Sequence, residues 1–593
     1  MSDNLQHECG VGLICLRKNL KYYENKYGSP YYGYQKLTLL LEKQHNRGQD
    51  GAGIACLSRG AQPGIPFFQL EKSCCELSLA DLLERINRRI SAALPLQEAF
   101  RDELAMSEKF PFCGEVYLGH LRYGTFGNRS LNACHPLIRD HSWRNHALLL
   151  AGNFNLTNTK ALFQKLISSG HHPKSLQDSE ILLALVVHYL ERQPLTEAGS
   201  SDLDLGGILQ RVASECDGGF HLCGVLGNGE AFALRDAAGI RPAFYYFDEE
   251  VVVAASERAT IQTTFNLKTA EVHELPPGHA LTVSSKGIVA LQPCLPERPA
   301  RKCVFERIYF SRGNDADIHR ERRALGQALV PAILNRIEHD YRNTVFSYIP
   351  NTAQTCFFGL LDELYRQGHG KHVRFAQIAV KDAKFRTFIS DADHRRDLFP
   401  HVYDVTYGII RPGSDNLVVL DDSIVRGNTM RNAILPILDR LDPKLIVVAS
   451  SAPPVRYPDC YGIDMASFQE LIAFEALQSL LKKTGQQSAL DKAVRLAEKD
   501  LSRGDENCKN RVKPLYALFS DEELALEISC LLRPPDLRAR LAVVYQSCRQ
   551  LRKCCPGHTG DWYFTGDYPT PGGNRVVNQA LLNYAHSIDQ RPY

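Results

Sequence analysis

Short apolar runs bounded by glycine or polar turn residues fill the first half of the chain. HALLLAGNF, EAFALRDAAG, EVVVAAS and HALTVSSKGIVAL are rich in strand-forming residues and lie between residue 9 and about residue 292. The stretch LADLLERINRRISAAL, between about 58 and 112, instead has apolar residues at helical spacing. The pattern predicts a sheet-dominated domain over residues 9–292 that carries a helical interruption on its surface.

The second half alternates helical and strand patterns. RERRALGQALVPAILNRIEHD has helical periodicity, whereas TVFSYI, LVVL and KLIVVAS are short, continuous apolar runs. Such alternation is typical of a parallel sheet covered by helices, whose ligands bind at the carboxyl ends of the strands. We therefore expect a second domain over residues 300–475, joined to the first by the linker CLPERPARK.

Three further segments complete the expected organisation. Residues 1–8 form a short polar leader, residues 476–552 have the pattern of charged amphipathic helices, and residues 553–593 form a turn-rich tail. No motif within 476–552 indicates a function. The fold class expected from this pattern combines α/β and α+β architecture, with a parallel sheet in the second domain.

Composition excludes several classes of protein. A length of 593 residues exceeds what one hydrophobic core supports, and 44% hydrophobic residues with a net charge of +2 indicate a globular chain with no overall attraction to nucleic acid or membranes. The longest strongly apolar run, Ile181 to Leu190, is too short to span a bilayer, and MSDNLQHE lacks a signal-peptide pattern. We expect a cytoplasmic protein whose 18 dispersed cysteines are reduced, and since no CxxC pair is present we expect no zinc site.

The stretch LVVLDDSIVRGNTM, residues 417–430, is the most specific motif of the second half. A buried strand ends in Asp421 and Asp422, and a loop with small and hydroxyl residues then leads into a helix. Such a loop directs backbone N–H groups at a phosphate, while the two carboxylates accept hydrogen bonds from sugar hydroxyls. An acidic strand end followed by a capped helix is the alternative interpretation.

This motif closely resembles that of type I phosphoribosyltransferases, which bind 5-phosphoribosyl 1-pyrophosphate (PRPP). The resemblance implies that Asp421 and Asp422 contact the ribose hydroxyls, and that Mg²⁺ accompanies the pyrophosphate near these two acids. It also implies that the loop binds the 5′-phosphate. The loop residues are Ser423, Ile424, Val425, Arg426, Gly427, Asn428 and Thr429.

Cys9 heads the apolar, glycine-spaced run CGVGLICL directly after the leader. A cysteine is a strong nucleophile only as a thiolate, so it requires a nearby base. If the leader were removed, the α-amino group of Cys9 would itself be that base, because its reference pKa is about 7.7 to 8.0. The alternative is an ordinary buried thiol.

Four segments downstream of Cys9 support the first interpretation. HNRGQDGAGIA (45–55), GHLRYGTFGN (119–128), LLLAGNFNLTN (148–158) and LQDSEILLAL (176–185) resemble, in order and spacing, the class II glutamine amidotransferases, which release ammonia from glutamine with an N-terminal cysteine. The resemblance implies an N-terminal nucleophile (Ntn) αββα domain with Cys9 as nucleophile, while Arg122 binds the glutamine carboxylate and Asp178 the ammonium. Asn153 and the N–H of Phe154 then stabilise the oxyanion.

Phe154 departs from the family pattern, which has glycine at that position. A bulky residue with a positive φ angle would be strained, so this position tests the glutaminase prediction.

A class II glutaminase followed by a PRPP-binding domain resembles the amidophosphoribosyltransferase family. The implied reaction converts PRPP, glutamine and water to 5-phosphoribosylamine, glutamate and pyrophosphate, the first step of purine synthesis. In AVKDAKFRTFIS, Lys381 and Arg386 are the cationic candidates of a loop over PRPP. The family's pyrophosphate loop reads Pro-acidic-Ser-Gly, whereas this chain has IPNTAQT with Asn351 and Ala353.

The resemblance also implies partners and cofactors. Family members are commonly homo-oligomers inhibited by purine nucleotides, and some carry a [4Fe-4S] cluster on four cysteines, two of them just before the FTG of the tail. Here that position reads GDWYFTG; Cys303 matches one ligand, Cys460 is offset by one residue, and Cys554 and Cys555 lie upstream. We expect no iron–sulfur cluster.

Two alternatives to the amidophosphoribosyltransferase function remain open from the sequence. Phe154, Asn351 and the long helical segment also fit a non-catalytic or regulatory paralogue that binds PRPP or nucleotide. The second alternative is an amidotransferase that delivers ammonia to a different phosphosugar.

Overall fold

The computed structural model describes residues 8–93, 110–124, 130–193, 203–381, 403–463, 465–503 and 508–592, with the backbone alone for Lys381 and Tyr403. The chain forms two compact units. The glutaminase-like unit comprises Gln6–Cys303 with the short segment Cys460–Asp464, and the second unit comprises Val304–Asp459 and Met465–Pro592. The change of unit at Cys303 lies directly after the proline-containing segment CLPERPARK.

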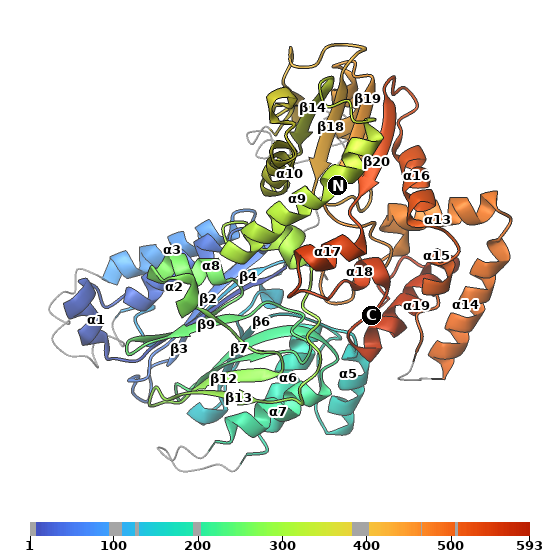
Figure 1. The fold of residues 1–593 in the computed structure, drawn as a ribbon. Coiled ribbons are helices and arrows are strands. Elements are labelled where there is room, and N and C mark those ends of the chain that lie inside the picture. Colours follow the sequence, from blue (N-terminus) through green and yellow to red (C-terminus); the bar gives the residue numbers. More distant parts are fainter. Residues whose placement is uncertain are drawn as a thin grey trace. The chain divides into compact units, whose positions relative to one another are not determined.

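The glutaminase-like unit contains two antiparallel sheets packed between helices (Figure 1). The order β11-β9-β10-β1-β4-β2-β3 describes the seven-stranded sheet, and β13-β12-β8-β7-β6-β5 the six-stranded sheet. The strands are β1 (Gly10–Leu16), β2 (Gly51–Leu57), β3 (Phe68–Ser73), β4 (Val116–Arg122), β5 (Leu137–Arg139), β6 (Leu148–Leu156), β7 (Gly218–Leu226), β8 (Ala231–Arg235), β9 (Phe244–Phe247), β10 (Val251–Ala255), β11 (His273–Glu274), β12 (His279–Val283) and β13 (Val289–Pro293).

Helices cover the outer faces of both sheets, which gives the predicted αββα arrangement. The buried residues of α1 (Leu20–Tyr27), α2 (Tyr32–Lys43), α3 (Ser78–Ala93) and α8 (Arg258–Phe265) share one core with the seven-stranded sheet. Those of α5 (Thr159–Ser168), α6 (Asp178–Leu190) and α7 (Leu205–Glu215) share another with the six-stranded sheet. The predicted helical interruption is α3, whose Leu82 and Ile86 are fully buried.

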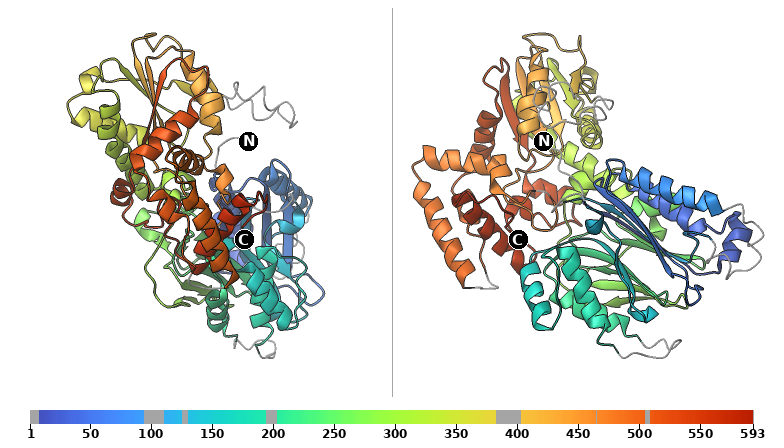
Figure 2. Two further views of the ribbon diagram at one scale, coloured as in Figure 1. Left: turned by 90° about the vertical axis from the view of Figure 1, so that its right-hand side faces the viewer. Right: turned by 180° about the vertical axis from the view of Figure 1, so that it is seen from behind.

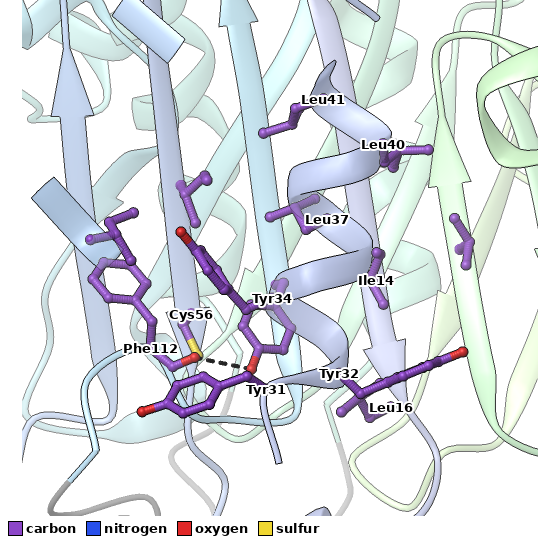
Figure 3. Close-up of a cluster of buried hydrophobic side chains, with 14 of the residues drawn as sticks. Ile14, Leu16, Tyr31, Tyr32, Tyr34, Leu37, Leu40, Leu41, Cys56 and Phe112 are labelled. Carbon is purple, nitrogen blue, oxygen red and sulfur yellow. Dashed lines mark hydrogen bonds between the residues drawn. The ribbon is translucent and has the colours of Figure 1, made fainter. Parts of the chain in front are cut away.

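Strand β1 shows how alternation builds these layers. Val11, Leu13 and Cys15 face the core between the sheets, while Ile14 and Leu16 face the helices, as the two-residue period of a strand requires. A Cβ atom on Gly12 would lie 2.8 Å from Leu40 Cδ2, so the absence of a side chain lets α2 approach the strand closely. In Figure 3, Leu37, Leu40 and Leu41 project from α2 toward the strands.

The second unit is built on a five-stranded sheet of order β15-β14-β18-β19-β20, in which all neighbouring strands are parallel. Its strands are β14 (Thr344–Tyr348), β15 (Arg374–Phe375), β18 (Asn416–Asp421), β19 (Leu445–Ser450) and β20 (Arg540–Tyr545). Strands β16 (Ala379–Lys381) and β17 (Tyr403–Val405) form a separate antiparallel pair. The predicted runs TVFSYI, LVVL and KLIVVAS are therefore strands of one parallel sheet.

Helices pack on this sheet, as the alternating pattern predicted (Figure 2): α10 (Gln354–Arg366) contacts β14, α9 (Ala316–Arg336) contacts β19 and β20, and α16 (Asp521–Leu532) contacts β20. The other helices of the unit are α12 (Leu435–Asp439), α13 (Ile472–Lys483), α14 (Gln487–Ser502), α15 (Lys513–Tyr516), α17 (Cys548–Cys554), α18 (Trp562–Thr565) and α19 (Pro571–Ala585), with π-helical turns at Glu306–Phe310 and Met430–Ile434. Of these, α14 packs against α19 and α13 against α16.

The segment 476–552 differs from the purely helical prediction. It contributes α14, α15 and α16 but also β20, which pairs with β19 from Leu445↔Arg540 to Ser450↔Tyr545. The run RLAVVY is short and apolar, and such a run is compatible with a helix or a strand until its neighbours are known.

No helix within the described parts of the chain is long and apolar enough to cross a membrane.

Leu40→Ala should destabilise the glutaminase-like unit by about 2–5 kcal/mol, because the fully buried side chain fills the space above Gly12. Hydrogen exchange of the β1 peptide measures this change locally. Leu77→Ala is the matched control, since Leu77 is 75% exposed and its truncation should change stability by about 0.5 kcal/mol or less. Equal exchange rates in the two variants would contradict the assigned packing.

Candidate active sites

Cys9 lies immediately before β1, and its sulfur faces the chain that leaves β4. Its Sγ accepts a hydrogen bond from the N–H of Tyr123 at 3.3 Å and lies 3.8 Å from the Tyr123 carbonyl oxygen. Burial raises the pKa of the Cys9 thiol to about 11, whereas Arg122 and Arg47 lower it and Asp178 raises it by their charges. The thiol is therefore protonated in this form of the chain, within electrostatic reach of both predicted glutamine-binding residues.

Arg122 and Asp178 approach the Cys9 thiol from a strand and a helix, respectively. Arg122 ends β4 and is 6% exposed, while Asp178 is the first residue of α6 and its Oδ1 accepts a hydrogen bond from Ser179 N at 2.8 Å. A carboxylate at a helix N-terminus is favoured by the helix dipole. One cation and one anion thus flank the thiol, which suits a zwitterionic amino acid.

Asn153 and Phe154 occupy consecutive positions of β6. Asn153 is 3% exposed, and its Nδ2 donates to Glu8 Oε2 at 3.1 Å. Phe154 has the extended backbone of the strand, and its ring stacks on His135 with a centroid distance of 5.4 Å and an interplanar angle of 17°. The bulky side chain therefore requires no positive φ, and it is accommodated by an aromatic neighbour.

Two buried histidines fix the residue before Asn153. His120 Nε2 lies 3.1 Å from the Gly152 carbonyl oxygen, and Gly152 N donates to His135 Nδ1 at 3.4 Å. Burial lowers the pKa of His120 to about 3 and that of His135 well below its usual value, so both rings are neutral. These hydrogen bonds fix the backbone of β6 at Gly152, immediately before Asn153.

Sequence reasoning missed the buried charges around Glu8. The Glu8 side chain is fully buried and contacts Arg47 Nη1 at 3.4 Å through Oε2 and Arg241 Nη1 through Oε1. Arg47 Nε also binds Glu257 Oε1 at 2.6 Å. Arg47 lies in the quoted segment HNRGQDGAGIA, and Arg241 follows the quoted segment EAFALRDAAG by two residues, but neither segment identifies the carboxylates that neutralise them.

Asp236 explains how Arg241 is positioned. Its buried carboxylate accepts hydrogen bonds from Ala238 N at 3.1 Å, Ile240 N at 2.9 Å and Arg241 N at 3.1 Å, which closes the turn after β8. Gly239 adopts a φ of 66° within that turn, which glycine accommodates without strain. The sequence DAAGIR therefore places the Arg241 guanidinium through backbone hydrogen bonds to one aspartate.

The DDS motif of the second unit lies where β18 ends, as predicted. Asp421 ends the strand, and Asp422 is fixed by its backbone, because its carbonyl oxygen accepts from Ala452 N at 3.1 Å and Ser451 Oγ at 3.0 Å. Ser423 Oγ donates to Asp422 Oδ1 at 3.2 Å. The two carboxylates are partly exposed at the carboxyl edge of a parallel sheet.

The loop residues after Ser423 differ in how far their side chains are buried and in what they contact. Ile424 and Val425 are 4% and 3% exposed, so only their backbones are available to a ligand, and Arg426 binds Glu470 Oε1 at 2.5 Å. Gly427 has a φ of 75°, and a Cβ there would lie 2.7 Å from both Ile472 and Leu532 side chains. Asn428 is exposed and Thr429 half-buried.

The loop over PRPP lies mostly outside the described residues. Arg386 is among the residues that the structure does not describe, and of Lys381 it gives the backbone, at the end of β16. The structure brings together Asp421, Asp422 and Ser423, but it does not locate the charged groups of Lys381 and Arg386.

The position of the family's iron–sulfur ligands holds aromatic side chains. Trp562 and Tyr563 are almost completely buried; Trp562 Nε1 donates to Asp459 Oδ1 at 3.1 Å, and the Tyr563 ring packs edge-on against Phe305 at 4.8 Å. Among the described residues, no three or more His, Cys, Asp or Glu side chains lie close enough together to hold a metal ion. The residues before the FTG segment supply no thiolate and do not fit a cluster.

Comparison with known proteins finds similarity over most of the chain. Residues 132–263 match a family model described as a glutamine amidotransferase domain. The amidophosphoribosyltransferase of Escherichia coli K12 is 30% identical over 61% of this chain and 70% of its own length, and that of Saccharomyces cerevisiae is 28% identical over 73% and 78%.

Solved structures share the whole fold. Glutamine PRPP amidotransferase from Bacillus subtilis, complexed with ADP and GMP, aligns with a TM-score of 0.62 at 22% identity, covering 95% of this chain and 97% of the other. A structure described as the allosteric regulatory enzyme of purine biosynthesis aligns with a TM-score of 0.64, also at 22% identity, covering 95% and 96%. With sequence similarity at this level to an enzyme that it largely spans, the chain belongs to the amidophosphoribosyltransferase family.

Proposed function

We propose that the chain catalyses the glutamine-dependent conversion of PRPP to 5-phosphoribosylamine, glutamate and pyrophosphate, the first step of purine synthesis. The observation that carries this proposal is the convergence of Cys9, Arg122 and Asp178 in one unit, together with the Asp421–Asp422 strand end in the other. Membership of the family supports it. No comparable observation favours a different phosphosugar or a non-catalytic role.

The glutaminase half requires a nucleophile, a base and an oxyanion site. Cys9 attacks the glutamine amide, Arg122 binds the α-carboxylate and Asp178 the α-ammonium, and Asn153 Nδ2 with Phe154 N–H stabilises the oxyanion. The base is the α-amino group of Cys9, which becomes available when the leader 1–8 is removed after Glu8. The glutamyl thioester is then hydrolysed by water, and the ammonia released is the nucleophile of the second reaction.

The phosphoribosyltransferase half uses the end of β18. Asp421 and Asp422 accept hydrogen bonds from the ribose hydroxyls, and the backbone of Ser423 to Thr429 binds the 5′-phosphate. Ammonia attacks C1 of PRPP as the C1–O bond to pyrophosphate breaks, with inversion. Lys381 and Arg386 neutralise the pyrophosphate from the loop over it.

Magnesium fits the donor chemistry of this strand end. Mg²⁺ prefers oxygen ligands, and Asp421 and Asp422 present two adjacent, partly exposed carboxylates. When bound with PRPP, the ion neutralises charge on the leaving pyrophosphate.

Regulation and assembly follow from the same family membership. The Bacillus subtilis relative was solved with ADP and GMP, so we include purine nucleotides among the inhibitors of this chain. A cytoplasmic homo-oligomer is the corresponding assembly.

Cys9→Ala should abolish glutamine-dependent pyrophosphate release while leaving the ammonia-dependent reaction within about twofold of wild type, because the second site does not use the thiol. Pyrophosphate release with each nitrogen source measures both rates. Cys75→Ala is the matched control, since Cys75 is an exposed thiol outside the site. Retained glutamine use in Cys9→Ala would refute the assigned nucleophile.

Asp422→Asn should weaken PRPP binding by about tenfold or more and lower both glutamine- and ammonia-dependent rates, because a charged acceptor for the ribose hydroxyls is lost. Calorimetric titration with PRPP and Mg²⁺ measures the affinity. Asp536→Asn replaces an exposed aspartate of the same unit and should change neither quantity. An unchanged PRPP affinity in Asp422→Asn would contradict the assignment of the DDS motif.

A further inference from the structure

The residue that precedes the candidate nucleophile is one of the most buried acids in the chain. Glu8 is 1% exposed, and its carboxylate is bound on both sides: Oε1 by Arg241 Nη1, and Oε2 by Arg47 Nη1 at 3.4 Å and Asn153 Nδ2 at 3.1 Å. A leader without a function would be expected to leave this position solvated, because burying a carboxylate is unfavourable unless it is paired.

The main chain of Glu8 is fixed as well. Its carbonyl oxygen accepts a hydrogen bond from Gly48 N at 3.1 Å. This carbonyl carbon is the atom that the adjacent Cys9 thiol reaches in a five-membered ring. An N–H donor at about 3 Å from that oxygen is the geometry that stabilises an oxyanion during acyl transfer.

The side-chain contacts select a carboxylate over its neutral analogue. A glutamate accepts hydrogen bonds at both oxygens, whereas a glutamine amide has one acceptor and one NH₂ donor. In this pocket either orientation of a glutamine would direct its NH₂ group at an arginine. Arg241 adds to the selection, because among the described residues its Nε and Nη2 have no hydrogen-bond partner, leaving Glu8 as the counter-charge that it contacts.

We infer that Arg47, Arg241 and Asn153 form a recognition pocket for the Glu8 side chain, and that this pocket, with Gly48 N–H on the Glu8 carbonyl, selects the Glu8–Cys9 bond for removal of the leader. The inference rests on the proposed function, since it supplies the free N-terminal Cys9 that the glutaminase reaction uses. Arg47 and Arg241 are positioning residues, while Gly48 contacts the reacting carbonyl.

The cleavage step needs only the chain and one water molecule. The Cys9 sulfur adds to the Glu8 carbonyl carbon, the C–N bond breaks as the nitrogen takes up the thiol proton, and a thioester with a free Cys9 amine results. Water then attacks the thioester, the C–S bond breaks, and the sulfur recovers a proton as Glu8 becomes a carboxylic acid. The net change is hydrolysis of one peptide bond.

Variants of Glu8 test the pocket cleanly, because every cleaved variant yields the same mature chain. Full-length chains carrying Glu8→Gln, Glu8→Asp or Glu8→Ala are produced by cell-free translation, and intact-mass measurement over time gives the rate and the position of cleavage. Glu8→Gln should be cleaved at least about tenfold more slowly than wild type, since a hydrogen-bonded charge is lost. Glu8→Asp should be cleaved faster than Glu8→Gln. Asp3→Asn, a charge-neutralising change elsewhere in the leader, should have no effect.

A variant of the pocket separates recognition from folding. In an Arg241→Gln background the effect of Glu8→Gln on the cleavage rate should shrink, as expected for two groups that interact directly. Hydrogen exchange of the β1 peptide verifies that each uncleaved chain is folded. Wild-type cleavage rates in Glu8→Gln and Glu8→Ala would overturn the recognition pocket.

A chain in which an initiator methionine directly precedes Cys9, and from which methionine aminopeptidase exposes Cys9, distinguishes failure of this inference from failure of the proposed function. If that chain uses glutamine while the full-length chain is never cleaved in isolation, self-cleavage is wrong and the proposed function stands. If the full-length chain uses glutamine with its leader intact, this inference and the Cys9 amine as base are wrong, while the proposed overall reaction stands. If the chain that starts at Cys9 does not use glutamine, the proposed function is wrong.

Discussion

In the uncleaved chain, the pairing of buried charges around Glu8 is the constraint that positions the loops at the start of β1. Arg47 and Arg241 are each 1% exposed, and two carboxylates, Glu8 and Glu257, neutralise them. In the uncleaved chain each of these buried charges therefore has a counter-charge, as burial of an ion requires. The chain segments that carry these residues follow α2, follow β8 and precede α8, so the network fixes three loops relative to the start of β1. Ion pairs between loop residues therefore position the site, whereas apolar packing holds the scaffold beneath it together.

The sequence predicted the scaffold better than this network. Continuous apolar runs such as LVVL and KLIVVAS are recognisable because strands of a covered parallel sheet are buried on both faces. The alternation in β1 and the helical spacing of α3 are equally local signals. The contacts Glu8–Arg47 and Glu8–Arg241 join residues 39 and 233 positions apart, and nothing local in either arginine's segment specifies its partner. Strand β20 was missed for a related reason, since its assignment depends on pairing with β19 and not on its own sequence.

The sequence named the candidate site residues of both units, but it did not show what each side chain does. Cys9, Arg122 and Asp178 were identified through a resemblance, and the structure places Arg122 and Asp178 within electrostatic reach of the Cys9 thiol. For the DDS loop, the resemblance named every residue from Ser423 to Thr429, but the structure distinguishes them. Ile424 and Val425 turn their side chains into the core, and Arg426 is engaged by Glu470. A loop that binds through its backbone needs such anchors, because buried side chains hold its N–H groups in place, and a motif alone does not separate anchors from contacts.

The state of the Cys9 thiol explains why the proposed glutaminase reaction requires removal of the leader. With a pKa of about 11, roughly one thiol in ten thousand is ionised at pH 7, so attack on an amide requires a base. In the uncleaved chain the nitrogen of Cys9 belongs to a peptide bond and is not basic. In the proposed mature chain the same nitrogen would be an amine that can accept the thiol proton. Arg122 and Arg47 favour the thiolate, because their positive charges lower the thiol pKa. The proposed proton transfer therefore has its acceptor only after the bond to Glu8 has been broken.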